Sequence, residues 1–214
     1  MKNHGEIVAR EGWIFILFFA VLTIGLYYFE AYITAILASI ISIFCVFFFR
    51  NPPRKIDGSK GVVVSPADGR VMDVVKVKET KYLQGPAVRV RIFLSIFDVH
   101  VNRVPIAGRI ELIEKVPGLY LAAYKDEAGQ KNARNYLGIN SEWGKILVVQ
   151  VTGLIARRLV CWVKPGEELM TGQRFGLIRF GSCTELYLPR EATILVQPGQ
   201  KVKGGESQIA RFCE

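Results

Sequence analysis

Residues 88–95 read VRVRIFLS, and their apolar side chains recur at every second position. The apolar residues at this spacing are Val88, Val90, Ile92 and Leu94. They share one face of an extended chain, because successive side chains of a strand point to opposite sides. The pattern is typical of a β-strand with one buried face, so it predicts a strand in the core of a sheet.

Similar β-rich runs lie on both sides of this segment. They are residues 61–65, 71–77, 146–151, 159–163 and 193–196, separated by turns rich in Gly and Pro. Short strands with this punctuation predict a β-sandwich or barrel. Residues 119–137 are polar and contain alanines, which predicts a loop with a little helix. The sequence therefore predicts a mainly β domain with minor helix over residues 56–214, and nothing in it favours a parallel βαβ fold.

A short repeat refines this architecture. PGEELMTGQ at residues 165–173 returns 33 positions later as PGQKVKGGE at residues 198–206. The common pattern is a turn, one inward apolar residue and a second turn. Such paired hairpins resemble the hammerhead units of lipoyl and biotinyl domains, but the lysine motif of those carriers is absent. The repeat therefore favours a barrel-sandwich architecture rather than a carrier function.

The N-terminal quarter is of a different kind. Residues 13–29 and 31–49 are two uncharged apolar runs of 17 and 19 residues, with only Glu30 between them. About 20 apolar residues span a bilayer core. A cleaved signal peptide would have one shorter apolar run and a small-residue cleavage site. The pattern predicts a membrane helical hairpin within a first domain, residues 1–55, which either spans the bilayer or enters one leaflet.

Charge predicts the side of the membrane. Basic residues precede the first apolar run and follow the second; they are Lys2, Arg10, Arg50, Arg54 and Lys55. Positive flanks are typical of the cytoplasmic side, so we expect both termini and the C-terminal domain at the cytoplasmic face of the cell membrane.

The net charge also limits the classes of molecule that the protein could bind. The net charge is +9, of which residues 1–55 carry only +2. A basic domain tethered to a membrane favours anionic lipid as its neighbour. Nucleic acid is the rival partner, but no helix-turn-helix, zinc finger or RNA-binding aromatic motif is present, so we expect none. A solvated basic surface with no specific partner remains an alternative.

Cysteine and histidine usage predicts no metal site. The four cysteines, Cys45, Cys161, Cys183 and Cys213, are irregularly spaced, and the only histidines are His4 and His100. A cytoplasmic domain keeps such thiols reduced.

Three motifs carry residues suited to catalysis. They are SPADG with Asp68, FLSIFDVHVNRVP with His100, and RFGSCTELYLP with Ser182. Each has an ordinary structural explanation as a turn, a strand end or a loop. Together an acid, an imidazole and a hydroxyl provide an orienting group, a base and a nucleophile, which can occur in any chain order.

On these motifs the chain resembles the short-type phosphatidylserine decarboxylase proenzymes, from about residue 61 to residue 202. FLSIFDVHVNRVP and RFGSCTELYLP are the most specific parts, and the apolar N-terminus also fits. The resemblance implies self-cleavage between Gly181 and Ser182, which gives associated chains 1–181 and 182–214. Ser182 would become a pyruvoyl group, a self-made cofactor that withdraws electrons as pyridoxal phosphate does. The implied reaction is decarboxylation of the serine headgroup of phosphatidylserine or a closely related lipid.

The resemblance also implies roles for individual residues. His100 would act as base toward Ser182, with Asp68 orienting it. Asn132 and Arg134 would contact the phosphate or carboxylate of the anionic serine phospholipid, since an arginine fork suits either group. Many larger members have a second histidine where this chain has Arg103, so one histidine would serve both steps or another group would help.

Three further points stay open. A membrane-anchored hydrolase could use Ser182 or Cys183 with His100, in an uncleaved chain. A tethered barrel-sandwich adaptor would show neither cleavage nor turnover. The lipid tail, phosphatidyl or archaetidyl, and the formation of a homo-oligomer are not determined by the sequence.

Overall fold

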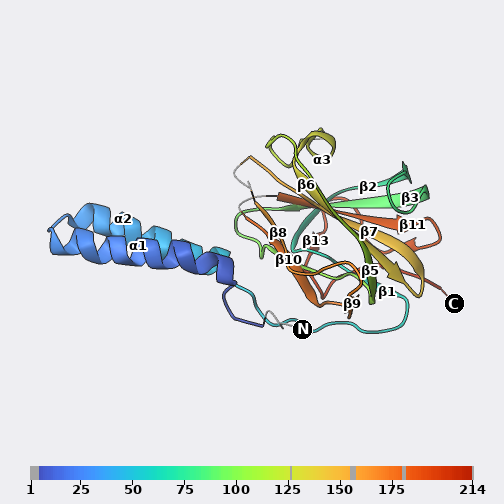
Figure 1. Cartoon of the computed structure of the whole chain (residues 1–214), viewed down its shortest axis with the longest axis horizontal. Coiled ribbons are helices and arrows are strands. Elements are labelled where there is room, and N and C mark those ends of the chain that lie inside the picture. The colour runs from blue at the N-terminus through green and yellow to red at the C-terminus, as the bar shows by residue number, and fades with distance from the viewer. Residues whose placement is uncertain (1–4, 126, 155–157, 180–181, 214) are drawn as a thin grey trace. The chain divides into compact units, whose positions relative to one another are not determined.

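The computed structural model describes residues 5–125, 127–154, 158–179 and 182–213. The chain forms two compact units, Met1–Pro53 and Arg54–Glu214, which we describe separately (Figure 1). The first unit is helical and the second is mainly β, as the sequence predicts.

The first unit is an antiparallel pair of helices, α1 (Arg10–Tyr28) and α2 (Tyr32–Phe48), joined by a tight turn at Glu30 with φ of 59°. At the base of the pair, Ala9 N–H donates to Phe49 O at 2.8 Å. Gly12 lets the helices approach there, because a Cβ on it would lie 2.5 Å from the Phe49 ring. Among the described helices, only α1 is long and apolar enough to cross a membrane, and α2 has 17 residues.

The second unit contains three antiparallel sheets. Its helix is α3 (Ala128–Lys131). Its strands are β1 (Val62–Val64), β2 (Gly69–Glu79), β3 (Gly85–Leu94), β4 (Val101–Arg103), β5 (Gly108–Val116), β6 (Arg134–Ser141), β7 (Gly144–Val151), β8 (Leu159–Cys161), β9 (Glu168–Leu169), β10 (Arg174–Ile178), β11 (Ser182–Pro189), β12 (Thr193–Ile194), β13 (Lys201–Val202) and β14 (Gln208–Arg211). The large sheet has the order β13-β2-β3-β11-β7-β6-β5-β9, and the small sheets are β1-β14-β12 and β4-β10-β8.

The strand that decides the fold lies near the middle of the large sheet, between β2 and β11. Its predicted inward residues Val90, Ile92 and Leu94 are fully buried. Val90 and Ile92 belong to the main core, which collects side chains from β1, β5, β7 and β10 as well. The other face of β3 carries Arg89 and Arg91, which pair with Asp73 of β2.

The repeat forms two equivalent edges of this sheet. β9 and β13 are its two outermost strands, and their inward residues Leu169 and Val202 are both buried. Glycines with positive φ occupy matching positions in the two copies: Gly166 (91°) and Gly199 (87°), then Gly172 (74°) and Gly205 (82°). The matched turns explain why the pattern P-G-x-x-[L/V]-x-x-G recurs, since glycine adopts this conformation without strain.

One sequence-based boundary is wrong. The predicted loop 119–137 ends sooner, because β6 begins at Arg134. Its polar residue Asn135 is fully buried and donates to Gln150 Oε1 on β7 at 2.9 Å. The prediction of a loop was wrong here because it took apolar residues as the sign of a buried strand. Asn135 is a polar residue that is buried in a strand through its hydrogen bond to Gln150.

Candidate active site

The structure brings segments of the three motifs together. Leu94, in the second motif, pairs with Ser182 across β3 and β11. The N–H of Arg103, also in the second motif, donates to Pro66 O of the first at 2.9 Å. Contacts between residues 88 and 37 positions apart in sequence thus join the three motifs.

Asp68 lies in the turn before β2. The turn is held by Gly69, where a Cβ would overlap the Phe93 carbonyl of β3. One carboxylate oxygen of Asp68 accepts from Arg54 at 2.7 Å and the other from the Gly204 N–H at 2.7 Å. Burial raises the pKa of the Asp68 carboxyl, and Arg54 partly offsets this effect.

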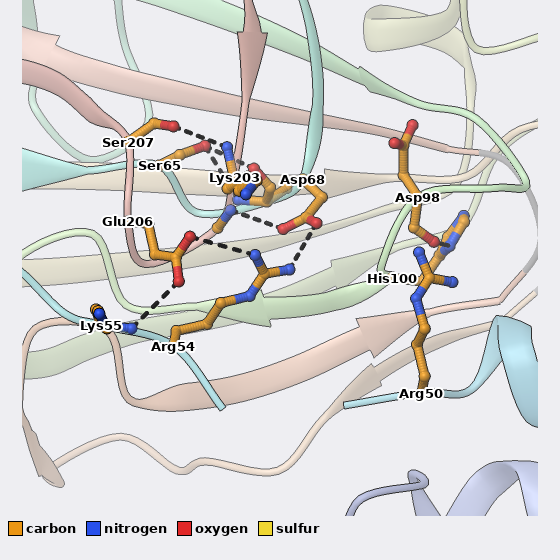
Figure 2. Close-up of polar contacts among 12 residues, drawn as sticks. Arg50, Arg54, Lys55, Ser65, Asp68, Asp98, His100, Lys203, Glu206 and Ser207 are labelled. Carbon is orange, nitrogen blue, oxygen red and sulfur yellow. Dashed lines mark hydrogen bonds and ion pairs between the residues drawn. The ribbon is translucent and has the colours of Figure 1, made fainter. Parts of the chain in front are cut away.

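Arg54 is the partner of Asp68 that sequence reasoning missed. Its side chain is buried and also lies 3.5 Å from Glu206, so two carboxylates flank one guanidinium (Figure 2). Within the described chain, the carboxylate of Asp68 makes no hydrogen bond to His100. The orienting role of Asp68 toward His100 therefore stays a prediction.

His100 is fully buried at the end of the turn before β4. Its Nδ1 lies 2.9 Å from the backbone oxygen of Asp98, two residues earlier (Figure 2). Because a carbonyl can only accept, this contact assigns the proton of the neutral ring to Nδ1 and leaves the lone pair on Nε2. The Asp98 side chain is itself held by Ser95, whose N–H and Oγ both donate to it at 2.8 Å. The turn thus fixes the His100 ring through Nδ1, and the role of His100 as a base stays a prediction.

Ser182 is the first residue of β11 and is fully buried. Across the described residues, its Oγ has no hydrogen-bond partner. Such an orphaned hydroxyl is rare in a protein interior and calls for an explanation. Gly181, the other half of the predicted cleavage bond, lies outside the described residues.

A buried chain of polar side chains continues from Ser182 along the same face of β11. Asn102 Nδ2 lies 3.3 Å from Thr184 Oγ1 and 3.4 Å from Pro66 O, and its Oδ1 accepts from Gln150 at 2.8 Å. Gln150 in turn accepts from Asn135. Asn102, which belongs to the second motif, therefore contacts Pro66 of the first motif and Thr184 of the third. The sequence signal that could have found it is a polar residue within the apolar run VHVNRV.

Arg103 occupies the position where larger relatives would have a second histidine. It is buried, and its guanidinium donates to Gly172 O at 3.0 Å. Burial, with Arg174 and Arg54 nearby, lowers the pKa of Arg103 to about 10. Arg103 is still charged at neutral pH, so it cannot serve there as a second base.

The two predicted substrate contacts differ in availability. The buried amide of Asn132 makes three hydrogen bonds to backbone groups of Leu121 and Thr152. It fixes a loop, and a contact with substrate stays a prediction. Arg134 donates to the carbonyls of Gly129 and Gln130, but its buried Nε has no partner in the described chain. Arg134 also lines a cavity of about 470 Å³.

Cys183 follows Ser182 but lies in a different environment. It is buried among apolar residues that include Leu147, Val149 and Val151. Burial, with Glu185 nearby, raises the pKa of the Cys183 thiol well above its ordinary value. A protonated thiol is a weak nucleophile, which disfavours Cys183 as the reactive group of a hydrolase. Among the described residues, no group of His, Cys, Asp and Glu could hold a metal ion.

A buried serine and a buried histidine on a β domain, in a chain that also carries an apolar helical pair, are typical of an enzyme. Comparison with known proteins makes the assignment specific. The family model described as phosphatidylserine decarboxylase matches residues 41–210. The chain belongs to this family.

Individual relatives agree over nearly the whole chain. It is 48% identical over 207 residues to the phosphatidylserine decarboxylase proenzyme of Carboxydothermus hydrogenoformans, covering 96% of this chain and 97% of the relative. The proenzyme of Symbiobacterium thermophilum is also 48% identical, covering 96% of each chain. That of Syntrophus aciditrophicus is 41% identical over 212 residues, covering 98% and 100%.

Proposed function

We propose that this chain cleaves itself between Gly181 and Ser182 and then decarboxylates the serine headgroup of phosphatidylserine or a closely related serine phospholipid. Family membership supports the reaction, since the relatives are named phosphatidylserine decarboxylase proenzymes. The observation that carries the cleavage site is the fully buried Ser182 hydroxyl without a partner in the described chain. A hydroxyl that holds no other group in place is available to attack its own peptide bond.

The cleavage begins with that attack. Ser182 Oγ adds to the carbonyl carbon of Gly181 while His100 Nε2 takes the hydroxyl proton. The C–N bond then breaks, the nitrogen of residue 182 receives the proton, and an ester joins the two chains. Removal of the Cα proton breaks the Cβ–O bond and releases Gly181 as a carboxylate. Water then displaces ammonia from the remaining dehydroalanine, which leaves a pyruvoyl group at position 182.

The surroundings of residue 182 fit this group. The position is fully buried, and its side-chain oxygen makes no hydrogen bond within the described chain. Losing the side-chain oxygen would therefore break no side-chain hydrogen bond seen in the structure. When present, the pyruvoyl group supplies an electron-withdrawing carbonyl for loss of CO₂.

Other residues position the reacting groups. The Asp98 carbonyl holds the His100 tautomer that accepts a proton at Nε2. Asp68 supplies a negative charge, and Arg54 and the N–H of Gly204 hold its carboxylate in place. Arg134 contacts the phosphate or carboxylate of the substrate through the cavity that it lines. Because the apolar helices carry basic flanks, we place the catalytic domain at the cytoplasmic face of the membrane.

The masses of the purified full-length protein in detergent test this proposal. We expect two chains, of which the smaller holds 33 of the 214 residues, about 3.7 of the 24.0 kDa. The small chain has a blocked N-terminus that borohydride reduces, and the preparation releases CO₂ from phosphatidylserine. Ser182→Ala is the control and should remain one chain without activity. A wild-type protein that is active while its chain is whole would contradict the proposal.

A further inference from the structure

Several loops of the β unit emerge at the same end of the large sheet. The aligned row Phe93, Cys183, Val151, Arg134 and Val116 crosses five neighbouring strands. At this row β3, β5 and β7 end, while β6 and β11 begin. We call the adjoining described segments the loop edge; they are residues 95–100, 117–125, 127–133, 152–154, 158 and 179. Ser182 is the first residue of β11 at this edge.

The loop edge contains a positively charged cavity. It has a volume of about 470 Å³ and is lined in part by Lys115, Arg134, Arg158 and Arg179. Among the described residues that line it, none is acidic. Arg179 precedes Ser182 by three residues in the sequence. Guanidinium groups bind phosphate through paired hydrogen bonds, so the cavity suits a phosphodiester.

The acidic residues of the described loop edge are already engaged. Asp98 accepts two hydrogen bonds from Ser95, and Glu127 pairs with Lys131 at 2.7 Å. Neither of these two described carboxylates lines the cavity.

Exposed apolar side chains lie on the same loop edge. Eight large hydrophobic residues are exposed in the described part of the β unit, and five of them lie on the loop edge. These five are Phe97, Leu119, Tyr120, Tyr124 and Leu154, with exposed fractions between 41% and 65%. Thr152 Oγ1 lies 3.5 Å from Leu119 O, which places the loop that carries Leu119 beside the one that carries Leu154. Clustering of this kind marks an interaction surface rather than scattered exposure.

We propose that the loop edge docks on a phospholipid bilayer. The aromatic and aliphatic side chains enter the headgroup region, where such residues are enriched, and the cavity holds the phosphodiester of one lipid. Charge complementarity selects this occupant, because phosphodiesters are anionic and the cavity is lined by cations without a carboxylate. This inference extends the proposed function: docking would present the headgroup to residue 182 with little extraction of the lipid.

A test must report on the loop edge itself, because the apolar helices alone could attach the protein to lipid. We suggest one tryptophan reporter, Phe97→Trp, in the full chain reconstituted into phosphatidylglycerol and phosphatidylcholine bilayers with brominated acyl chains. The matched reporter is Met170→Trp, at an exposed apolar residue that follows β9 at the opposite end of β5. Both carry Trp13→Phe, Trp143→Phe and Trp162→Phe, so that the reporter is the one tryptophan of the chain. We expect brominated lipid to quench most of the reporter emission at residue 97 and little at residue 170.

A charge reversal tests the cavity. In the reporter protein, Arg158→Glu should lower the ratio of docked to undocked protein by at least about fivefold, because losing one basic residue near an anionic surface costs ~1 kcal/mol and the new carboxylate adds repulsion. Arg190→Glu makes the same change just beyond the other end of β11 and should have little effect. Equal quenching of the two reporters would overturn docking at this edge. Equal effects of the two charge reversals would overturn the role of the cavity.

The same samples separate this inference from the proposed function. Self-cleavage consumes only the protein's own peptide bond, so the chain masses report on it without any contribution from docking. A quenched residue-97 reporter in an uncleaved wild-type chain would support docking and reject the self-cleaving decarboxylase.

Discussion

Ser182 and Cys183 are consecutive residues of β11 with side chains on opposite faces of one sheet. Both are buried, and both side chains can act as nucleophiles. We call the face of β11 that carries Ser182 the serine face and the opposite one the cysteine face. The serine face also carries Thr184, which contacts Asn102, and Asn102 in turn accepts from Gln150. The cysteine face packs on apolar side chains and leads to Glu185, which accepts from Tyr187 at 2.7 Å.

The difference shows that environment outweighs intrinsic reactivity. A thiol is the better nucleophile in water, but burial beside Glu185 holds the Cys183 thiol in its protonated form. A serine hydroxyl is weak at neutral pH and needs a base, which the Nε2 atom of His100 can provide. We therefore expect cleavage chemistry to follow the face of the strand rather than the type of nucleophile.

Moving the hydroxyl to the other face should have the largest effect. The double variant Ser182→Ala, Cys183→Ser keeps a hydroxyl within one residue of its original place but directs it away from the serine face. We expect no self-cleavage, measured as a single 24.0 kDa chain after prolonged incubation. Cleavage of this variant before residue 183 would show that the face of the strand does not matter.

Removing the base should have the next largest effect. General-base catalysis contributes roughly 10²–10⁴ in rate, so His100→Gln should slow cleavage by about that factor. The measurement is the half-life of the whole chain after synthesis in a cell-free system, followed by its mass. A melting temperature close to that of the wild type separates lost chemistry from lost folding. Cleavage at the wild-type rate would remove His100 from the mechanism.

The strands of the β unit could not all be predicted equally well from the sequence. The apolar alternation of Val90, Ile92 and Leu94 predicted β3, and the repeat predicted the matched turns around one inward apolar residue, because both signals are local. β4 and β10 were not predicted. β4 consists of Val101, Asn102 and Arg103, and its polar side chains are stabilised by partners 36 or more positions away.

The site shows the same limit. Asp68, His100 and Ser182 could be picked out because their residue types suit catalysis. Their partners could not, because Arg54 contacts Asp68 from outside every motif, and the group that holds His100 is a backbone carbonyl. Sequence gives the candidate reacting atoms, whereas the groups that set their proton positions depend on the fold.

We expect the hydrogen-bonded side chains of Thr184, Asn102 and Gln150 to hold Ser182 in position for cleavage. Asn102→Ala leaves Gln150 and Thr184 without their partner, which should cost about 1–3 kcal/mol in the free energy of unfolding. Cleavage should also slow by about tenfold to a hundredfold, since small displacements of reacting groups have effects of this size. Urea denaturation and the precursor half-life measure the two effects.

Asn140→Ala is the matched control for that variant. Asn140 is exposed and contacts Glu111, so we expect neither effect. If Asn102→Ala loses stability but cleaves at the wild-type rate, the polar chain holds the core together without positioning Ser182.

The smallest effect is expected on the cysteine face. Cys183→Ala should leave the rate of cleavage unchanged and lower the free energy of unfolding by about 1 kcal/mol for the small cavity it makes. Because burial raises the pKa of Cys183, its thiolate is scarcer than that of an ordinary cysteine at every pH below that raised value. Alkylation by iodoacetamide should therefore be much slower at Cys183 than at the exposed Cys213, and the two rates should converge after denaturation. Rapid alkylation of Cys183 in the folded chain, together with lost cleavage in Cys183→Ala, would move the reactive centre to the other face of β11.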